Sequence, residues 1–496
     1  MTDQTNSSKP NVLLICTDHL PHALTRAAGH PAVMTPTFEH LARSGTVFEN
    51  CYSACPVCGP ARRTLMTGLS SRGHGDRVFS SDPMPAVTTL PQAFRDAGYQ
   101  AYAVGKMHWH PQRARYGFDD VILNEEGRMA RGPGRLDDYE MDIVERGYAG
   151  QEYGSGMASN DYVARPFQLP EECHQTNWTA REACRMISRR DPTRPAFWYV
   201  SFTMPHPPLF PLRDYLEMYR DVRIDEPVIG NWARDVDTMP YALRDRVRGY
   251  SINGATRHEL ELAHRAFYAL ITHIDHQVRL IVGTLREQGL LDNTIIAITA
   301  DHGDMLGDHG IWAKQVFFDR SANVPLIISG TPTGEHLTGG GRDDRLVELR
   351  DVMPTLLEMA GVDIPSHVEG ASLLHPSRRE TLYGEIHEHG ARAFRMVRDQ
   401  RYKLCYYPMG NRFQLFDMTT DPREATDLYE NAAHAEARQR LTGVLRRELH
   451  GSDAKWFRDG RLGGDLIGEP EPTAPLRQGG GHTSRSLLGQ RGLRFY

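Results

Sequence analysis

The chain has 496 residues and a formal net charge of −6; 40% of its residues are hydrophobic and 24% are charged. These values are typical of a globular protein with a substantial core, and the negative balance argues against a nucleic-acid partner. Five of the seven cysteines are scattered, and no disulfide framework is predicted. Residues 1–10 lack the apolar core of a signal peptide, and no run approaches the roughly 20 apolar residues of a membrane span. The sequence therefore predicts a cytoplasmic protein without a membrane partner.

The first predicted element is a buried strand over residues 11–17, because Asn-Val-Leu-Leu-Ile-Cys-Thr is a short apolar run. Asp18 and His19 follow it directly. Ligands of open α/β sheets gather at the carboxyl ends of strands, so this pair is a candidate binding site; for Asp18, a turn or helix cap is the alternative. Residues 35–45 then read as a capped helix that ends at a glycine.

The most informative stretch begins at Cys58. Pro60 suits the first turn of a helix, so we expect Cys58 at a helix N-terminus, where N–H groups and the helix dipole favour negative charge. Arg62 lies one turn further on and could reach an oxyanion held there. Three interpretations stay open at this point: a structural thiol, a redox pair with Cys55, and a nucleophile for phosphate or sulfate. A cysteine phosphatase is excluded because it needs arginine where Thr64 stands.

The next elements lead to a lysine and a histidine. A helix over residues 90–98 and a strand over residues 99–104 precede Lys106 and His108, whose side chains point to the same face because they are two residues apart. A surface lysine and a histidine at the edge of the core are the alternative. Residues 112–191 then lose periodicity, and we interpret them as an irregular insert, which in a compact domain is functional or disordered.

A further buried strand, residues 195–203, delivers His206. This histidine stands between prolines and is therefore held rigidly, which suits a general acid; a structural histidine is the alternative. A second irregular insert at about 212–255 precedes a long amphipathic helix over residues 259–288.

The strand predicted over residues 294–299 ends in a second acidic–histidine pair, Asp301 and His302, and Lys314 follows in the same loop. One such pair after a strand is weak evidence. Two pairs, here and at residues 18–19, could meet at the carboxyl edge of one sheet. Asp308 and His309, which lie between, are expected to order the loop.

The remaining predicted elements are a strand at 323–330, a helix at 348–361, short antiparallel strands at 382–386, 394–407 and 413–417, and a helix at 432–449. This change of pattern predicts a main domain of residues 1–375 and a small antiparallel subdomain of residues 376–450. Residues 451–496 are rich in Gly, Pro and Arg. They read as an extended tail, either disordered or an arm that clasps another subunit of a homo-oligomer.

Together these motifs resemble the sulfatase family. The stretch from Cys58 to Gly68 matches its Cys-x-Pro-x-Arg signature with Thr-Gly after a further gap, and Ala61 is similar to the choline sulfatase and phosphonate monoester hydrolase branches. Gly-Lys-x-His, Pro-His-x-Pro and the two acidic–histidine pairs also occur in the family's order along the chain. The resemblance covers about residues 11–449. The resemblance implies the α/β fold of the alkaline phosphatase superfamily, with a mixed, mainly parallel sheet between helices and a small antiparallel C-terminal subdomain. It also implies that the inserts form the rim of the substrate pocket.

The resemblance also implies roles for single residues. A maturation enzyme would oxidise Cys58 to formylglycine, whose hydrated aldehyde is the nucleophile. One divalent metal, Ca²⁺ first and Mg²⁺ or Mn²⁺ as alternatives, would be held by Asp18, His19, residue 58, Asp301 and His302. His19 departs from the family's usual Asp or Gln. The groups that handle charge and protons would be Arg62, Lys106 and Lys314 on the sulfate, His108 as the base and His206 as the acid.

The predicted reaction is hydrolysis of a sulfate monoester to an alcohol and inorganic sulfate. A phosphonate monoester or phosphodiester hydrolase of the same superfamily is the alternative, and a catalytically silent metal-binding relative is the third. Ala61 favours the phosphorus branch, whereas Gly-Lys-Met-His and Lys314 favour true sulfatases. The alcohol part of the substrate stays open among a sugar sulfate, choline sulfate and an aryl sulfate.

Overall fold

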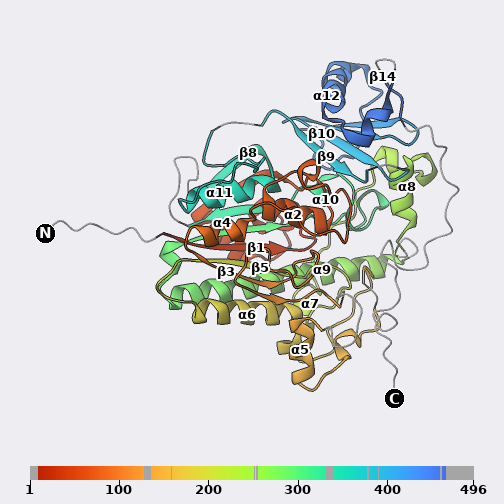
Figure 1. Ribbon diagram of the computed structural model, residues 1–496. Coiled ribbons are helices and arrows are strands. Elements are labelled where there is room, and N and C mark those ends of the chain that lie inside the picture. Colours follow the sequence, from red (N-terminus) through yellow and green to blue (C-terminus); the bar gives the residue numbers. More distant parts are fainter. Residues whose placement is uncertain are drawn as a thin grey trace.

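The computed structural model describes residues 9–127, 136–157, 159–250, 252, 255–330, 339–376, 379–388, 390–458 and 461–464. An eight-stranded sheet forms the centre of the main domain, in the order β4-β3-β5-β1-β6-β7-β2-β8 (Figure 1). Its strands are β1 (Asn11–Thr17), β2 (Gly45–Tyr52), β3 (Gln100–Gly105), β4 (Asp120–Leu123), β5 (Ala196–Ser201), β6 (Thr294–Ala300), β7 (Leu326–Ser329) and β8 (Gly341–Glu348).

All pairs of neighbouring strands in this sheet are parallel except those of β7, which runs antiparallel to β6 and to β2. The strands β1, β5, β6 and β7 are buried at every position. Continuous apolar strands of this kind form when helices cover both faces of a sheet. The mixed, mainly parallel sheet confirms the predicted α/β class.

Helices cover the two faces of the sheet (Figure 1). On one face α6 (Gln175–Arg189) packs along α9 (Arg257–Glu287), and α1 (Pro36–Ser44) and α7 (Arg213–Glu217) also contact α9. On the opposite face lie α2 (Cys58–Thr67), α4 (Leu90–Asp96) and α11 (Val352–Met359), which contact one another. A capping box between Thr256 and Glu259 starts α9, close to the predicted beginning of that helix. Within the described ranges, none of the helices is long and apolar enough to cross a bilayer.

A smaller antiparallel sheet, β12-β11-β10-β9, forms the C-terminal subdomain. Its strands are β9 (Leu382–Ile386), β10 (Phe394–Arg398), β11 (Tyr402–Tyr407) and β12 (Arg412–Asp417), and α12 (Ala435–Glu448) packs on β10 and β11. One cluster of buried side chains joins this sheet to the main domain; it includes Met305, Phe317, Phe318, Phe394, Met396 and Phe416. The predicted antiparallel subdomain is thereby confirmed.

Part of the segment predicted as a tail is folded. Residues Gly451–Trp456 form a 3-10 helix, in which Asp453 pairs with the buried Arg395 at 2.7 Å and Trp456 is completely buried. A two-residue pairing of β13 (Phe457–Arg458) with β14 (Arg461–Leu462) follows. The rest of the predicted tail, residues 459–460 and 465–496, lies outside the described residues.

The interpretation of residues 112–191 and 212–255 as irregular was wrong in part. The first range contains β4, α5 (Asp138–Glu145) and α6, and the second contains α7 and α8 (Tyr241–Arg248). In α6 the buried Ala180, Ala183 and Ile187 recur at helical spacing, but arginines on the outer face interrupt the apolar pattern. The helix therefore owes its position to packing against α9 as well as to its own sequence.

Candidate active site

Four parallel strands, adjacent in the order β3-β5-β1-β6, end at one edge of the sheet. The polar residues selected from the sequence that follow these strand ends are Asp18, His19, Lys106, His108, His206, Asp301 and His302. The first turn of α2 brings Cys58 to the same place, and the loop after β6 adds Lys314. Here β3 approaches β5 so closely that residue 105 must be glycine: its φ is +100°, and a Cβ would overlap the carbonyl oxygen of Ser201.

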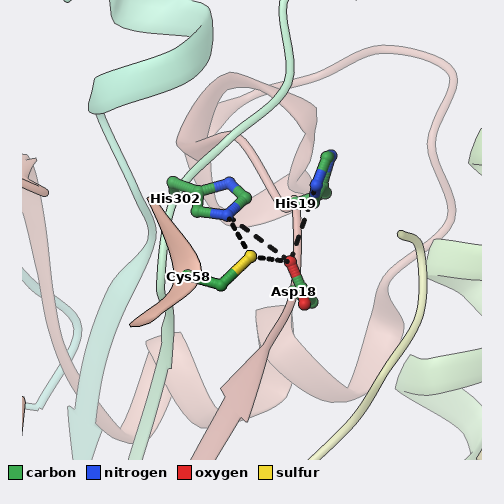
Figure 2. A group of neighbouring side chains, drawn as sticks. All are labelled: Asp18, His19, Cys58 and His302. Atoms are coloured by element: carbon green, nitrogen blue, oxygen red, sulfur yellow. Dashed lines mark hydrogen bonds and ion pairs between the residues drawn. The ribbon is translucent and has the colours of Figure 1, made fainter. Parts of the chain in front are cut away.

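Four buried side chains form a group that could hold a metal ion (Figure 2). Asp18, His19, Cys58 and His302 each offer one ligand atom, and these atoms all lie within 4.8 Å of one another. The Sγ of Cys58 is 3.2 Å from Nε2 of His302 and 3.8 Å from Oδ1 of Asp18. That carboxylate oxygen is 3.5 Å from Nε2 of His302 and 3.7 Å from Nε2 of His19. One carboxylate, two imidazoles and residue 58 therefore converge on one point.

Asp301, the remaining ligand expected from the sequence, lies at the border of this group. Its Oδ2 accepts a hydrogen bond from Nε of Arg62 at 2.9 Å, and its Oδ1 accepts one from the backbone N–H of His302 at 2.9 Å. The same Oδ1 is 3.6 Å from the ring nitrogen Nε2 of His302. In this structure Asp301 thus orients Arg62 and the strand end.

Cys58 is the first residue of α2, as the sequence predicted, and only 4% of it is exposed. Its Sγ accepts a hydrogen bond from Nζ of Lys314 at 2.8 Å. Burial and the neighbouring Asp18 each act to raise the pKa of the thiol, but Lys314, Lys106 and His302 outweigh them and bring the pKa below its usual value. Cys55 lacks this environment, because burial raises its pKa instead, and both residues are free thiols. The surroundings of residue 58 favour negative charge on that side chain.

Three cations surround the same point. Arg62 is 1% exposed, and its Nη1 donates to the carbonyl oxygen of Lys106 and to Oγ of Ser201, both at 2.6 Å. Its Nη2 lies 3.6 Å from Asp18 and has no hydrogen-bond partner among the described residues. Lys106 pairs with Asp18, and Lys314 donates to Nε2 of His19 at 2.6 Å. A buried donor without a partner beside two ammonium groups is suited to hold an oxyanion.

The two remaining histidines differ in their partners. His108 has its Nδ1 3.3 Å from the buried carboxylate of Glu125, which also accepts the backbone N–H of His108 at 2.7 Å. His206 is buried, and its Nδ1 donates to the carbonyl oxygen of Pro207 at 2.5 Å. Burial, Lys106 and Lys314 hold the pKa of His206 well below its usual value, so its imidazole is neutral at pH 7 in this environment. The ring centroid of His206 is 4.4 Å from that of His19, so His206 lies next to the group of possible metal ligands.

Residues 10–362 match the family model described as Sulfatase, and residues 307–450 match the C-terminal part of N-sulphoglucosamine sulphohydrolase. The chain belongs to the sulfatase family. An arylsulfatase of Clostridium perfringens is 34% identical over 489 residues, which cover 94% of this chain and 99% of that protein. A choline-sulfatase of Rhizobium meliloti is 30% identical, and the match covers 86% of this chain and 83% of that protein.

Solved structures agree with this fold. The phosphonate monoester hydrolase of Agrobacterium radiobacter superposes with a TM-score of 0.76 at 24% identity, over 88% of this chain and 94% of that chain. At that identity the likeness shows the fold. The predicted family and the predicted alkaline-phosphatase-like architecture are therefore confirmed.

Sequence reasoning missed several carboxylates in this sulfatase, among them Glu126, which pairs with Lys106 at 2.9 Å. Glu125, at the end of β4, positions His108, and Asp304 accepts a hydrogen bond from Nδ1 of His19 at 2.7 Å. Each is one acidic residue among several in a loop, and the sequence offers no spacing that separates it from its neighbours. The position of Glu125, two residues after the apolar run of β4, was the signal in the sequence that could have pointed to it.

Asp308 and His309 lie outside the group of metal-ligating side chains. Asp308 accepts the backbone N–H of Val228 at 2.9 Å and pairs with Arg423 at 2.8 Å. His309 accepts the backbone N–H of Gly230 at 3.1 Å through its Nδ1. Both residues hold the loop against neighbouring segments, which is the role expected from the sequence.

A cavity opens beside His206. It is lined by Glu126, Glu152, Ser155, Met157, Ser159, Gln175, Met204, His206, Pro207, Pro208 and Phe210. Most of these residues come from the first insert and from the segment that follows β5. The walls combine apolar side chains with acidic and hydroxyl groups, as substrate pockets in enzymes do.

Proposed function

We propose that this sulfatase hydrolyses sulfate monoesters to an alcohol and inorganic sulfate, with formylglycine formed from Cys58 as the nucleophile. The observation that carries this proposal is the position of Cys58. Its side chain stands at a helix N-terminus, 2.8 Å from Lys314 and 3.2 Å from His302, inside a buried group of possible metal ligands. When Cys58 is converted, the hydrated aldehyde supplies one hydroxyl that attacks sulfur and a second whose ionisation expels sulfate.

The donor set fits one divalent cation. Asp18, His19 and His302, together with residue 58, would hold it, because their ligand atoms converge and all four side chains are buried. Such a cation would supply Lewis acidity, which would polarise a sulfate oxygen and favour an ionised hydroxyl at position 58.

The protein's own residues then account for binding and proton transfer. Lys106, Lys314 and Nη2 of Arg62, which has no hydrogen-bond partner among the described residues, would bind the sulfate oxygens and offset the charge that develops on them. His206 lines the cavity where the alcohol would lie, and we assign it to protonation of the leaving oxygen. The negative charge of a bound ester opposes the effect of the two lysines on the pKa of His206. His108, oriented by Glu125, would take the proton from the second hydroxyl.

The alcohol part of the substrate would lie in or next to the cavity beside His206. The relatives named arylsulfatase and choline-sulfatase support an aryl or choline ester, and a sugar sulfate is the third candidate. The partner that the proposal requires is a formylglycine-generating maturation enzyme. A cytoplasmic location and a homo-oligomeric state stay predictions from the sequence.

The test combines mass spectrometry with matched substrates. The peptide that contains residue 58 should lose sulfur and gain oxygen when the chain is co-expressed with a maturation enzyme, and Cys58→Ala protein is the control. The converted enzyme should have a higher kcat/KM for a nitrophenyl sulfate than for a phosphonate monoester or a phosphodiester with the same leaving group. An unmodified thiol in active enzyme would refute the formylglycine mechanism. A clearly higher kcat/KM for either phosphorus ester would assign the protein to the phosphonate monoester and phosphodiester hydrolases, the branch that Ala61 favours.

A further inference from the structure

His19 has a buried carboxylate directly behind its ring. The Nδ1 of His19 lies 2.7 Å from Oδ2 of Asp304, and the hydroxyl of Tyr162 donates to the same oxygen. The other oxygen of Asp304 accepts the backbone N–H groups of Leu306 at 2.9 Å and Ala313 at 3.1 Å. His19 and Asp304 are completely buried and Tyr162 nearly so. The carboxylate is thus fixed on both oxygens, and the imidazole ring can only turn its opposite edge to the site.

This arrangement decides which nitrogen of His19 carries the proton. A carboxylate at Nδ1 requires an N–H there, so the lone pair is on Nε2. Nε2 accepts a hydrogen bond from the ammonium of Lys314 at 2.6 Å, which agrees with this tautomer. The same atom is 3.7 Å from Oδ1 of Asp18, and the ring centroid is 4.6 Å from that of His302. The lone pair of His19 therefore faces the other possible metal ligands.

Few carboxylate oxygens are free to bind a metal ion between these side chains. Asp18 turns its Oδ2 to Lys106, and Asp301 is bonded through both oxygens to Arg62 and to the backbone of His302. Ca²⁺ prefers about six to eight oxygen ligands, whereas imidazole nitrogen suits first-row transition metals. Two of the four convergent donors are imidazoles, so the donor set is poorer in oxygen than the one that Ca²⁺ prefers.

We propose that Asp304 and Tyr162 are positioning residues that hold Nε2 of His19 as a metal ligand, and that the site thereby selects a divalent first-row transition metal ion over Ca²⁺. The proposal rests on the proposed function only in assuming that a cation binds at this point. According to this proposal, Lys314 loses its hydrogen bond to His19 when the metal binds and keeps its hydrogen bond to residue 58.

The experiment measures metal binding directly and needs no turnover. Calorimetric titrations with Mn²⁺, Zn²⁺ and Ca²⁺ use the metal-free full chain in the Cys58→Ser background, so that a thiolate does not add affinity for soft ions. The same titrations are made with His19→Asp, Asp304→Asn and Tyr162→Phe. Asp308→Asn is the matched control, because Asp308 is a buried carboxylate of the same loop that does not touch the site. Thermal melting verifies that each variant is folded.

We expect the parent protein to bind Mn²⁺ or Zn²⁺ at least about tenfold more tightly than Ca²⁺. His19→Asp should shift this ratio toward Ca²⁺ by about tenfold or more, since it replaces nitrogen with oxygen. Asp304→Asn should weaken transition-metal binding by about 10- to 100-fold, and Tyr162→Phe by less, while Asp308→Asn leaves it unchanged. EPR of the Cu²⁺-loaded protein should lose one coupled nitrogen in His19→Asp.

A preference of the parent protein for Ca²⁺, or a metal ratio that His19→Asp does not change, would overturn the proposal. Normal metal affinity in folded Asp304→Asn would remove Asp304 from its positioning role. None of these results would affect the test of the proposed function, which reads the mass of residue 58 and the rates with matched esters. The two proposals can therefore fail separately.

Discussion

Replacing His174 with asparagine removes a buried imidazole and keeps a helix cap. His174 precedes α6; its Nδ1 accepts the backbone N–H of Thr176 at 3.1 Å, and its Nε2 donates to the carbonyl oxygen of Phe210 at 3.2 Å. The side chain is completely buried, and burial lowers its pKa from 6.5 to about 4, although the bond to Phe210 acts in the opposite direction. Asparagine is a favoured cap at this position, so the variant should fold.

The magnitude follows from proton binding. The unfolded chain binds a proton at this histidine below pH 6.5, whereas the folded chain does so only below a pKa of about 4. The unfolded state therefore binds more protons in this interval, and stability falls as the pH falls through it. At about pH 5 the loss is about 2 kcal/mol, because roughly 1.5 units separate that pH from the unfolded value and each unit is about 1.4 kcal/mol.

The assay is urea unfolding followed by tryptophan fluorescence, at about pH 7.5 and about pH 5. Between these two pH values the unchanged protein should lose about 2 kcal/mol more unfolding free energy than His174→Asn does. His258→Asn, in the exposed first turn of α9, is the control and should lose as much as the unchanged protein. The adjacent His273, which is buried, is kept in both proteins, so its contribution should largely cancel. Equal losses in the unchanged protein and His174→Asn would refute the reasoning.

Three further changes test the active site. Cys58→Ser should abolish repeated turnover, measured as released sulfate, because serine lacks the second hydroxyl; normal turnover would contradict the nucleophile. His206→Asn should lower kcat/KM for an alkyl sulfate by about 10²- to 10⁴-fold and hardly affect that for nitrophenyl sulfate, whose leaving group needs no proton. Equal losses with the two substrates would mean that another residue is the general acid. Gly105→Ala should lower the melting temperature sharply, because a Cβ would overlap the Ser201 carbonyl oxygen, and an unchanged melting curve would show that the strands can separate there.

The sequence predicted those parts of the fold that depend on local patterns. The apolar run of β1 has the observed bounds, Asn11–Thr17, and β9 and the start of α2 also agree. The edge strand β8 was not predicted, because Gly-Arg-Asp-Asp-Arg reads as a loop and becomes a strand only by pairing with β2. Tertiary contact, which local propensity does not contain, decides such elements.

The same limit applies to the site. Strand-end motifs indicated Asp18, His19 and His302, and the structure brings them together with Cys58. The partner of His19 was not recognised, because Asp304 lies 285 residues away and is one of several acidic residues in its loop. Spacing along the chain identifies residues that carry chemistry, but the groups that orient them depend on how loops from different strands meet.

The loop that carries Lys314 is built into the core shared by the main domain and the C-terminal sheet. Phe317 and Phe318 pack there with Phe394 and other residues of that sheet, and Nζ of Lys403 donates to the carbonyl oxygen of Phe317 at 2.9 Å. The C-terminal sheet therefore supports the loop that carries Lys314, although it contributes none of the residues proposed for chemistry. For protein engineering this means that the two parts are not interchangeable modules: a chimera that takes its C-terminal sheet from another sulfatase should take the loop around Lys314 from the same parent.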